Sequence, residues 1–140
     1  MAAAILDGSL IALLATVTVT DLRSRLVPDR ALLAAGVVAL VAVTLAESGE
    51  LPERLLCALG AGGFLLAAAL LRPDGMGLGD VKLAGVLGLY LGGAVVTALL
   101  VAFAAGALAG VAIVSARGWE ARSRAIPFAP FLALGALIAV

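Results

Sequence analysis

The sequence contains no histidine, a single cysteine and few charged residues. Without histidine, the chain lacks the side chain that most often serves acid–base catalysis and metal ligation near neutral pH. Cys57 alone can form neither an internal disulfide nor a cysteine-cluster zinc site, and we expect it to be a small buried side chain. The formal net charge is zero, so no basic surface for a nucleic acid is expected. These absences exclude histidine-based chemistry, cysteine-rich metal sites and nucleic-acid binding.

Hydrophobic residues, in contrast, make up 64% of the 140 residues, and charged residues only 13%. The mean hydropathy is +1.25, whereas charged residues approach a quarter of a typical soluble domain. A membrane-crossing helix needs about 20 apolar residues, so the chain has room for about six crossings joined by short loops. We therefore predict an all-α, polytopic integral membrane protein in which residues 1–140 form a single membrane domain.

Apolar runs between polar breaks mark the candidate membrane spans. The first run lacks the basic segment of a secretory signal, so we interpret it as a span. Residues 81–114 form a nearly unbroken apolar stretch that is too long for one crossing, and we expect it to turn back at Gly92-Gly93. The predicted spans cover residues 4–20, 31–46, 55–71, 81–91, 94–114 and 126–140.

Basic residues are distributed unevenly over the loops between these spans. With six spans, one side receives Asp7, Glu47, Glu50, Glu53 and, of the nine basic residues, only Arg54. The positive-inside rule makes the basic side cytoplasmic and places both termini outside, in a multi-pass protein of the cell membrane. The residues on the cytoplasmic side are Arg23, Arg25, Arg30, Arg72, Lys82, Arg117, Arg122 and Arg124.

Two aspartates lie at span ends on this same side. Asp21 follows the run "ATVTVT", and Asp80 precedes the apolar run that begins at Val81. An ionisable residue at membrane depth is costly unless it is paired or solvated, so both raise a functional question. Two carboxylates brought close cannot both ionise easily; one keeps a proton, and the pair can then act as general base on a water and general acid on a leaving group. From the residues alone, Asp80 can instead pair with Lys82 or cap the following helix, and Asp21 can be a loop carboxylate beside Arg23.

Glycines precede the second aspartate in "GMGLGDVKL". Glycine tolerates positive φ and has no Cβ, so Gly77 and Gly79 would let the backbone bend sharply and lie close to another backbone or a ligand. Irregular backbone at this depth is tolerated only when it is buried in protein or lines a wet cavity. We expect these glycines to form a mobile approach that brings Asp80 to Asp21 and to an extended substrate.

Three blocks of the sequence form a recognisable series. The first is "TDLRSRLVPD", which contains Asp21 and Pro28; the second is "GMGLGDVKLAGVLGLYLG", in which residues 77–80 form a GxGD motif; the third is "AIPFAPFLALGAL", which contains Pro127 and Pro130. In this order and spacing the blocks resemble the prepilin peptidases, the type IV leader peptidases among the GxGD membrane aspartic proteases. The resemblance covers nearly the whole catalytic domain and implies the GxGD aspartic protease fold.

The resemblance implies roles for individual residues. Asp21 and Asp80 match the two catalytic aspartates, which hold a water and need neither a metal nor an organic cofactor. The family often has Asn where this chain has Asp29, and a helix N-cap explains either residue. We expect the prolines to shape turns and helix entry beside the active site and to carry no chemistry. The residues expected to bind substrate or shape the site are Gly77, Gly79, Lys82, Pro28, Pro127 and Pro130.

The substrates implied are prepilin-like proteins, which carry a short basic leader that is cut at the cytoplasmic face just before an apolar helix. The chain lacks the paired-cysteine region of the longer family members, so we expect no N-methyltransferase activity. It is more similar to the short members that serve Flp/Tad-type pili or related systems. The glycines at 85, 88, 92, 106 and 110 predict close helix packing, within one chain or in a homo-oligomer.

Two other functions stay open at this point. A small transporter or channel-like protein could use Asp21 and Asp80 to bind a proton or a cation, although this would not explain the three ordered blocks. A non-catalytic component of a pilus assembly machine could retain the same fold. Processing of prepilins, and its loss on substitution of either aspartate, would distinguish the protease from both.

Overall fold

The computed structural model describes residues 1–24, 27–46, 48–73, 76–118 and 128–140, and within these ranges the chain is helical and contains no strand. The prediction of an all-α protein is confirmed. The described residues form α1 (Ala2–Ser24), α2 (Asp29–Ala46), α3 (Leu51–Leu71), α4 (Leu78–Leu91), α5 (Val95–Arg117) and α6 (Ala129–Ala139), with the short 3₁₀ turns η1 (Ser48–Glu50) and η2 (Gly92–Ala94).

Each predicted apolar run contributes one of these helices. Four helical segments are long and apolar enough to cross a membrane, and the last of them, residues 78–117, contains both α4 and α5. This segment reverses where the sequence predicted it. Gly92 has φ of +55°, a left-handed value that favours glycine, and α5 begins three residues later at Val95. The chain is thus a polytopic helical protein with membrane-spanning character.

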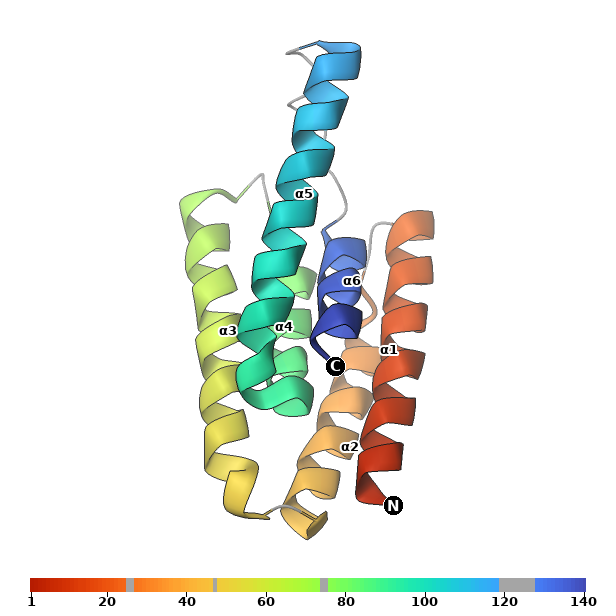
Figure 1. The fold of residues 1–140 in the computed structure, drawn as a ribbon, viewed down its shortest axis with the longest axis vertical. Coiled ribbons are helices and arrows are strands. Elements are labelled where there is room, and N and C mark those ends of the chain that lie inside the picture. Colours follow the sequence, from red (N-terminus) through yellow and green to blue (C-terminus); the bar gives the residue numbers. More distant parts are fainter. Residues whose placement is uncertain (25–26, 47, 74–75, 119–127) are drawn as a thin grey trace.

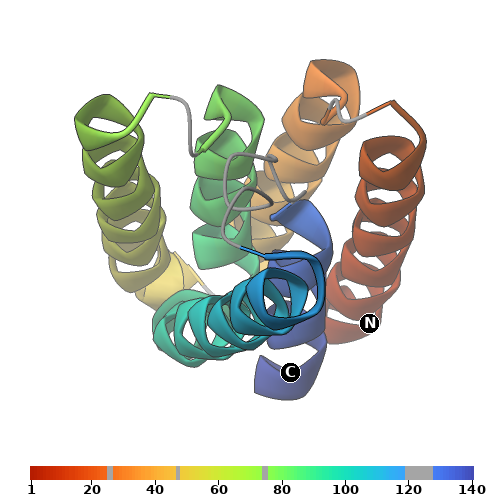
Figure 2. The ribbon, with the colours of Figure 1, turned by 90° about the horizontal axis from the view of Figure 1, so that it is seen from above.

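Successive helices run in opposite directions (Figure 1). One end of the bundle holds the C-termini of α1, α3 and α5 and the N-termini of α2, α4 and α6; because Asp21 and Asp80 lie there, we call it the aspartate end. Viewed from this end, α3, α4, α2 and α1 follow one another around an arc, and α6 and α5 close the ring (Figure 2). The C-terminal part of α5 rises beyond the other helices (Figure 1).

Small residues allow the closest helix contacts. A Cβ added to Gly88 of α4 would lie 2.5 Å from Cα and 2.6 Å from N of Ala58 in α3, so the two backbones touch there. Gly85, one turn earlier, faces the same helix at an ordinary distance, 3.7 Å from the Ala58 carbonyl. Gly135 of α6 packs in the same way on the Ala98 backbone of α5. Of the glycines predicted to serve close packing, Gly88 does so within one chain, Gly85 and Gly106 make contacts at ordinary distances, and Gly110 faces open space.

The short helix α6 packs one face against α1, α4 and α5. Its buried residues include Ala129, Leu132 and Ala136, whose exposed fractions are all 0%. All four phenylalanines of the chain form a continuous series of ring contacts that joins α3, α5 and α6. Ring centroids are 6.0 Å apart for Phe64–Phe103, 5.3 Å for Phe103–Phe128 and 6.4 Å for Phe128–Phe131. Aromatic packing therefore fixes the entry of α6 into the bundle.

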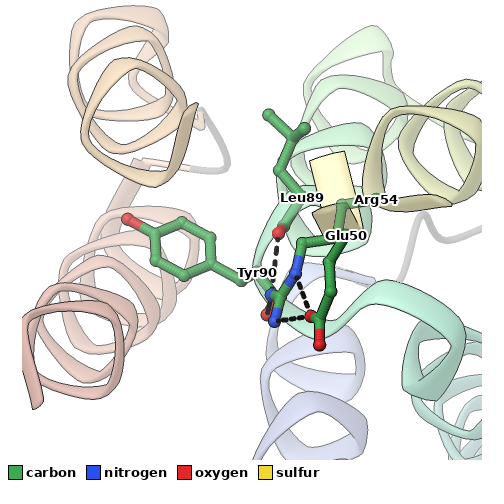
Figure 3. Close-up of polar contacts among 4 residues, drawn as sticks. All are labelled: Glu50, Arg54, Leu89 and Tyr90. Atoms are coloured by element: carbon green, nitrogen blue, oxygen red, sulfur yellow. Dashed lines mark hydrogen bonds and ion pairs between the residues drawn. The ribbon is translucent and has the colours of Figure 1, made fainter. Parts of the chain in front are cut away.

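A polar network closes the end opposite the aspartates (Figure 3). Arg54 of α3 donates to the carbonyls of Tyr90 at 2.7 Å and Leu89 at 3.3 Å, and its guanidinium also pairs with Glu50 at 2.9 Å. These carbonyls belong to the last turn of α4, which has no intrahelical donor for them. The Tyr90 hydroxyl donates to the Ala35 carbonyl in α2 at 3.0 Å. Arg54 therefore caps the C-terminal end of α4. The sequence placed Arg54 in an acidic outer loop and did not predict this role.

Candidate functional site

Asp80 lies in the first turn of α4 and is only 9% exposed. Gly77 is the N-cap residue of this helix, and its backbone N–H interacts with the Asp80 carboxylate. Asp80 is therefore the third helical residue whose side chain reaches back to the N-cap, as the acidic member of a capping box does. The positive end of the helix dipole also favours a carboxylate here. The sequence analysis considered a helix-capping role for Asp80, and the structure shows one. The interaction with the N-cap orients the carboxylate and leaves other lone pairs of its oxygens available.

Asp21 lies near the C-terminal end of α1 and is 5% exposed. Its Oδ2 atom is inaccessible to solvent. The charges of Asp21 and Asp80 are close enough to interact, although the residues come from different helices and lie 59 positions apart. The structure therefore brings together the two carboxylates that the sequence singled out, in a nearly buried position at one end of the bundle.

The contact between Gly79 and Val27 joins the two halves of this site. A Cβ on Gly79 would lie 2.9 Å from Cβ and 3.1 Å from Cγ2 of Val27, which belongs to the connection between α1 and α2. Any larger residue at position 79 would have to displace Val27 from α4. Gly79 thus allows a close approach of two chain segments beside the aspartates.

This finding corrects the conformational role predicted for the two glycines. Gly77 has φ of −81° and ψ of 151°, an extended conformation open to any residue, and Gly79 is helical. Among the described glycines, positive φ occurs only at Gly92 and Gly118. Neither glycine of the motif therefore provides a sharp left-handed bend, and the value of Gly79 is steric.

Lys82 pairs with Asp29 rather than serving as the partner of Asp80. Its Nζ atom donates to Oδ1 of Asp29 at 2.9 Å, and the side chains are 54% and 70% exposed. Asp29 is the first residue of α2. The ion pair therefore links the N-terminal ends of α2 and α4 on the outer surface of the aspartate end, with Lys82 two residues after Asp80 in α4.

Two of the three prolines predicted to shape the site, Pro28 and Pro130, lie at the start of helices. The Pro28 carbonyl accepts a hydrogen bond from the Leu32 N–H at 3.2 Å, so Pro28 directly precedes α2. Pro130 lies in the first turn of α6, where a missing N–H costs nothing. Pro127 lies outside the described residues.

Sequence reasoning missed Val27 and the network of Arg54 and Tyr90. Val27 carries no polar group, and only the three-dimensional contact with Gly79 reveals its role. Arg54 was the single basic residue on the acidic side of the predicted topology. That isolation was a usable signal, because a lone arginine among acidic residues at a span end is well placed to bind helix carbonyls.

The fold places two carboxylates close enough for their charges to interact, in a shielded position at one end of the bundle. Such a pair can shuttle one proton between its members, and the apolar surroundings strengthen every charge interaction within it. The chemistry available is general acid–base catalysis by carboxyl groups. A hydrolytic reaction needs no other group if the substrate is held against the pair.

In a comparison with known families, residues 8–114 fit the model of the type IV leader peptidase family. The matched range contains Asp21, Asp80 and the Gly79–Val27 contact, whereas the block at 126–131 lies beyond it. Searches of curated proteins and of solved structures gave no match. Because the matched range covers well over half of the 140 residues, the chain belongs to the type IV leader peptidase family and is a membrane protease of that general kind.

Proposed function

We propose that this protein is an aspartic endopeptidase that removes the short basic leader from prepilin-like substrates of the Flp/Tad type or a related system. The observation that carries the proposal is the pair of shielded carboxylates, Asp21 from α1 and Asp80 from α4, whose charges interact at one end of a helical bundle. Family membership supports a leader peptidase in general. The aspartic mechanism and the substrate are our own inference.

In the proposed reaction, Asp21 and Asp80 hold a water between them, one ionised and one protonated. The ionised carboxylate takes a proton from the water as the water oxygen attacks the scissile carbonyl carbon. The protonated carboxyl then gives its proton to the leaving amide nitrogen as the C–N bond breaks. After one turnover the pair again holds a single proton, now on the carboxyl that had been ionised, and transfer of this proton between the two carboxyls restores the starting state once the new carboxyl and amino ends leave.

We also propose that the aspartate end faces the cytoplasm of the cell that makes the protein. Within the described residues, Arg23, Arg30, Arg72, Lys82 and Arg117 lie at helix ends on this side, and Arg54 lies at the other. The positive-inside rule assigns the more basic side to the cytoplasm. A substrate whose leader stays in the cytoplasm while its apolar helix enters the bilayer then presents the bond between them at the level of Asp80.

The test is processing of a prepilin-like substrate co-expressed with the wild type, Asp21→Asn or Asp80→Asn. Asn keeps the volume of the carboxyl group but cannot carry the proton, so we expect each variant to lose at least about 1,000-fold in cleavage rate, within the range assigned to acid–base groups. Asp7→Asn is the matched control, because Asp7 is an exposed carboxylate of the same helix α1 at the opposite end. Cleavage by either active-site variant at the wild-type rate would rule out the paired-aspartate mechanism.

A further inference from the structure

A groove of about 510 Å³ runs along the outer surface between α2 and α4. Its α2 side contains Leu33, Val37 and Leu40, which are 72%, 53% and 41% exposed. Its α4 side contains Val86 and Leu89. In a membrane-spanning bundle these side chains face the bilayer, so an occupant of the groove arrives laterally through the apolar phase.

The groove has a polar head and an apolar body. Asp29 and Lys82, the exposed ion pair, line its head at the aspartate end, and the body extends along α2 as far as Leu40. At 1.5 Å per residue, Asp29 to Leu40 is about 16 Å, or three turns of helix. This length is about half of a hydrocarbon layer of about 30 Å.

We propose that this groove binds the first three turns of the substrate's apolar helix, with the basic leader directed to Asp29. The inference rests on the proposed function and adds a docking surface to it. An apolar helix matches the leucine- and valine-lined body. A basic leader residue complements the Asp29 carboxylate and can replace Lys82 there at little cost, because exposed ion pairs are weak.

The position of the groove relative to the carboxylates supports this occupant. Lys82 at the head lies two residues after Asp80 in α4. Two residues of helix correspond to about 3 Å along the axis of α4, so the head of the groove and Asp80 lie at nearly the same depth. A substrate helix seated in the groove therefore has its junction with the leader at the level of the carboxylates.

A second apolar groove, of about 350 Å³, lies between α3 and α5 and serves as an internal comparison. It is lined by Gly60, Leu100 and Phe103 among others, and no charged residue lines it. Of the two grooves, only the α2–α4 groove is lined by a carboxylate, that of Asp29, which can pair with a basic leader residue once Lys82 is displaced.

Disulfide cross-linking tests the proposal directly. The enzyme carries Asp80→Asn, to keep the substrate uncut, Cys57→Ala, to remove the native thiol, and either Val37→Cys or Leu100→Cys. Val37 and Leu100 are comparably exposed, at 53% and 65%. A prepilin-like substrate with one cysteine about two turns into its apolar helix should give at least tenfold more cross-linked product with Val37→Cys. Equal yields, or a preference for Leu100→Cys, would overturn the proposal.

Filling each groove gives an independent measurement. A Cβ at Gly36 of α2 meets only Cγ2 of Val86 at 3.7 Å, and one at Gly60 meets nothing within 4 Å, so both helices tolerate a side chain. Gly36→Phe should lower cleavage at subsaturating substrate at least tenfold, whereas Gly60→Phe should stay within twofold of wild type. Cleavage by Gly36→Phe at the wild-type rate would refute the docking site. If the wild type itself cuts no prepilin-like substrate, the proposed function fails; if it cuts but the cross-links do not favour the α2–α4 groove, only the docking site fails.

Discussion

Replacing Gly79 by alanine should disturb the carboxylate pair without touching either carboxylate. The new Cβ would lie 2.9 Å from Cβ of Val27, whereas carbon atoms pack best at about 3.5–4.0 Å. The connection between α1 and α2 must therefore move by roughly 0.6–1.1 Å. Since a misplacement of about 1 Å can cost about 100-fold in rate, we expect Gly79→Ala to lose about 10- to 100-fold in leader cleavage.

Two further variants separate this steric effect from a general loss of stability. Gly77→Ala adds a Cβ that would meet only the Gly79 nitrogen, at 4.0 Å, and its extended backbone suits alanine, so it should lose far less activity. Val27→Gly removes both atoms that the Gly79→Ala Cβ would strike, and the double variant should recover most of the lost rate. The assay is prepilin cleavage in membranes, normalised to enzyme abundance.

The reasoning would be refuted by a Gly79→Ala enzyme that cleaves at the wild-type rate. It would equally be refuted if Gly77→Ala were the more damaging change, because the motif glycines would then act through backbone conformation. A double variant no faster than Gly79→Ala would show that Val27 is not the obstacle.

Two predictions concern the stability of the bundle in detergent. Arg54→Met should lower the thermal unfolding midpoint, because losing the cap of the α4 carbonyls costs about 1–3 kcal/mol. Glu50→Gln should change the midpoint far less, because the Glu50 side chain is 57% exposed. Equal shifts of the midpoint for the two variants would argue against the cap. Gly88→Ala should destabilise by about 1–3 kcal/mol, because its Cβ would overlap the Ala58 backbone. Gly85→Ala is the control, because its Cβ would lie 3.7 Å from the Ala58 carbonyl oxygen, and it should unfold at or above the wild-type midpoint. A Gly88→Ala protein as stable as the Gly85→Ala protein would contradict the close crossing of α3 and α4.

Hydropathy and turn chemistry predicted the architecture well. The reversal at Gly92-Gly93 followed from an apolar stretch too long for one crossing, and the structure places η2 there. Helix ends were less predictable, because backbone hydrogen bonds continue past the last apolar residue. α1 extends to Ser24, so Asp21 belongs to a helix and not to a loop.

The candidate site was predictable only in its polar members. Asp21 and Asp80 could be selected because carboxylates are costly at membrane depth. The steric role of Gly79 could not be predicted from the sequence, because it depends on the position of Val27, which is set by tertiary packing. The same holds for the partner of Lys82: Asp29 is distant in sequence, and only the contact of α2 with α4 brings the two charges together.

Because α4 is short, the thickness of the bilayer affects access to the two carboxylates. With 14 residues, α4 is about 21 Å long, against about 30 Å of hydrocarbon. A helix capped by Arg54 at one end and carrying Asp80 near the other cannot place both of these polar groups in water across an undeformed membrane. The mismatch is relieved where lipids thin around the protein or where its surface dips below the headgroups. Lipid composition then helps to decide how readily water and a substrate reach the carboxylates.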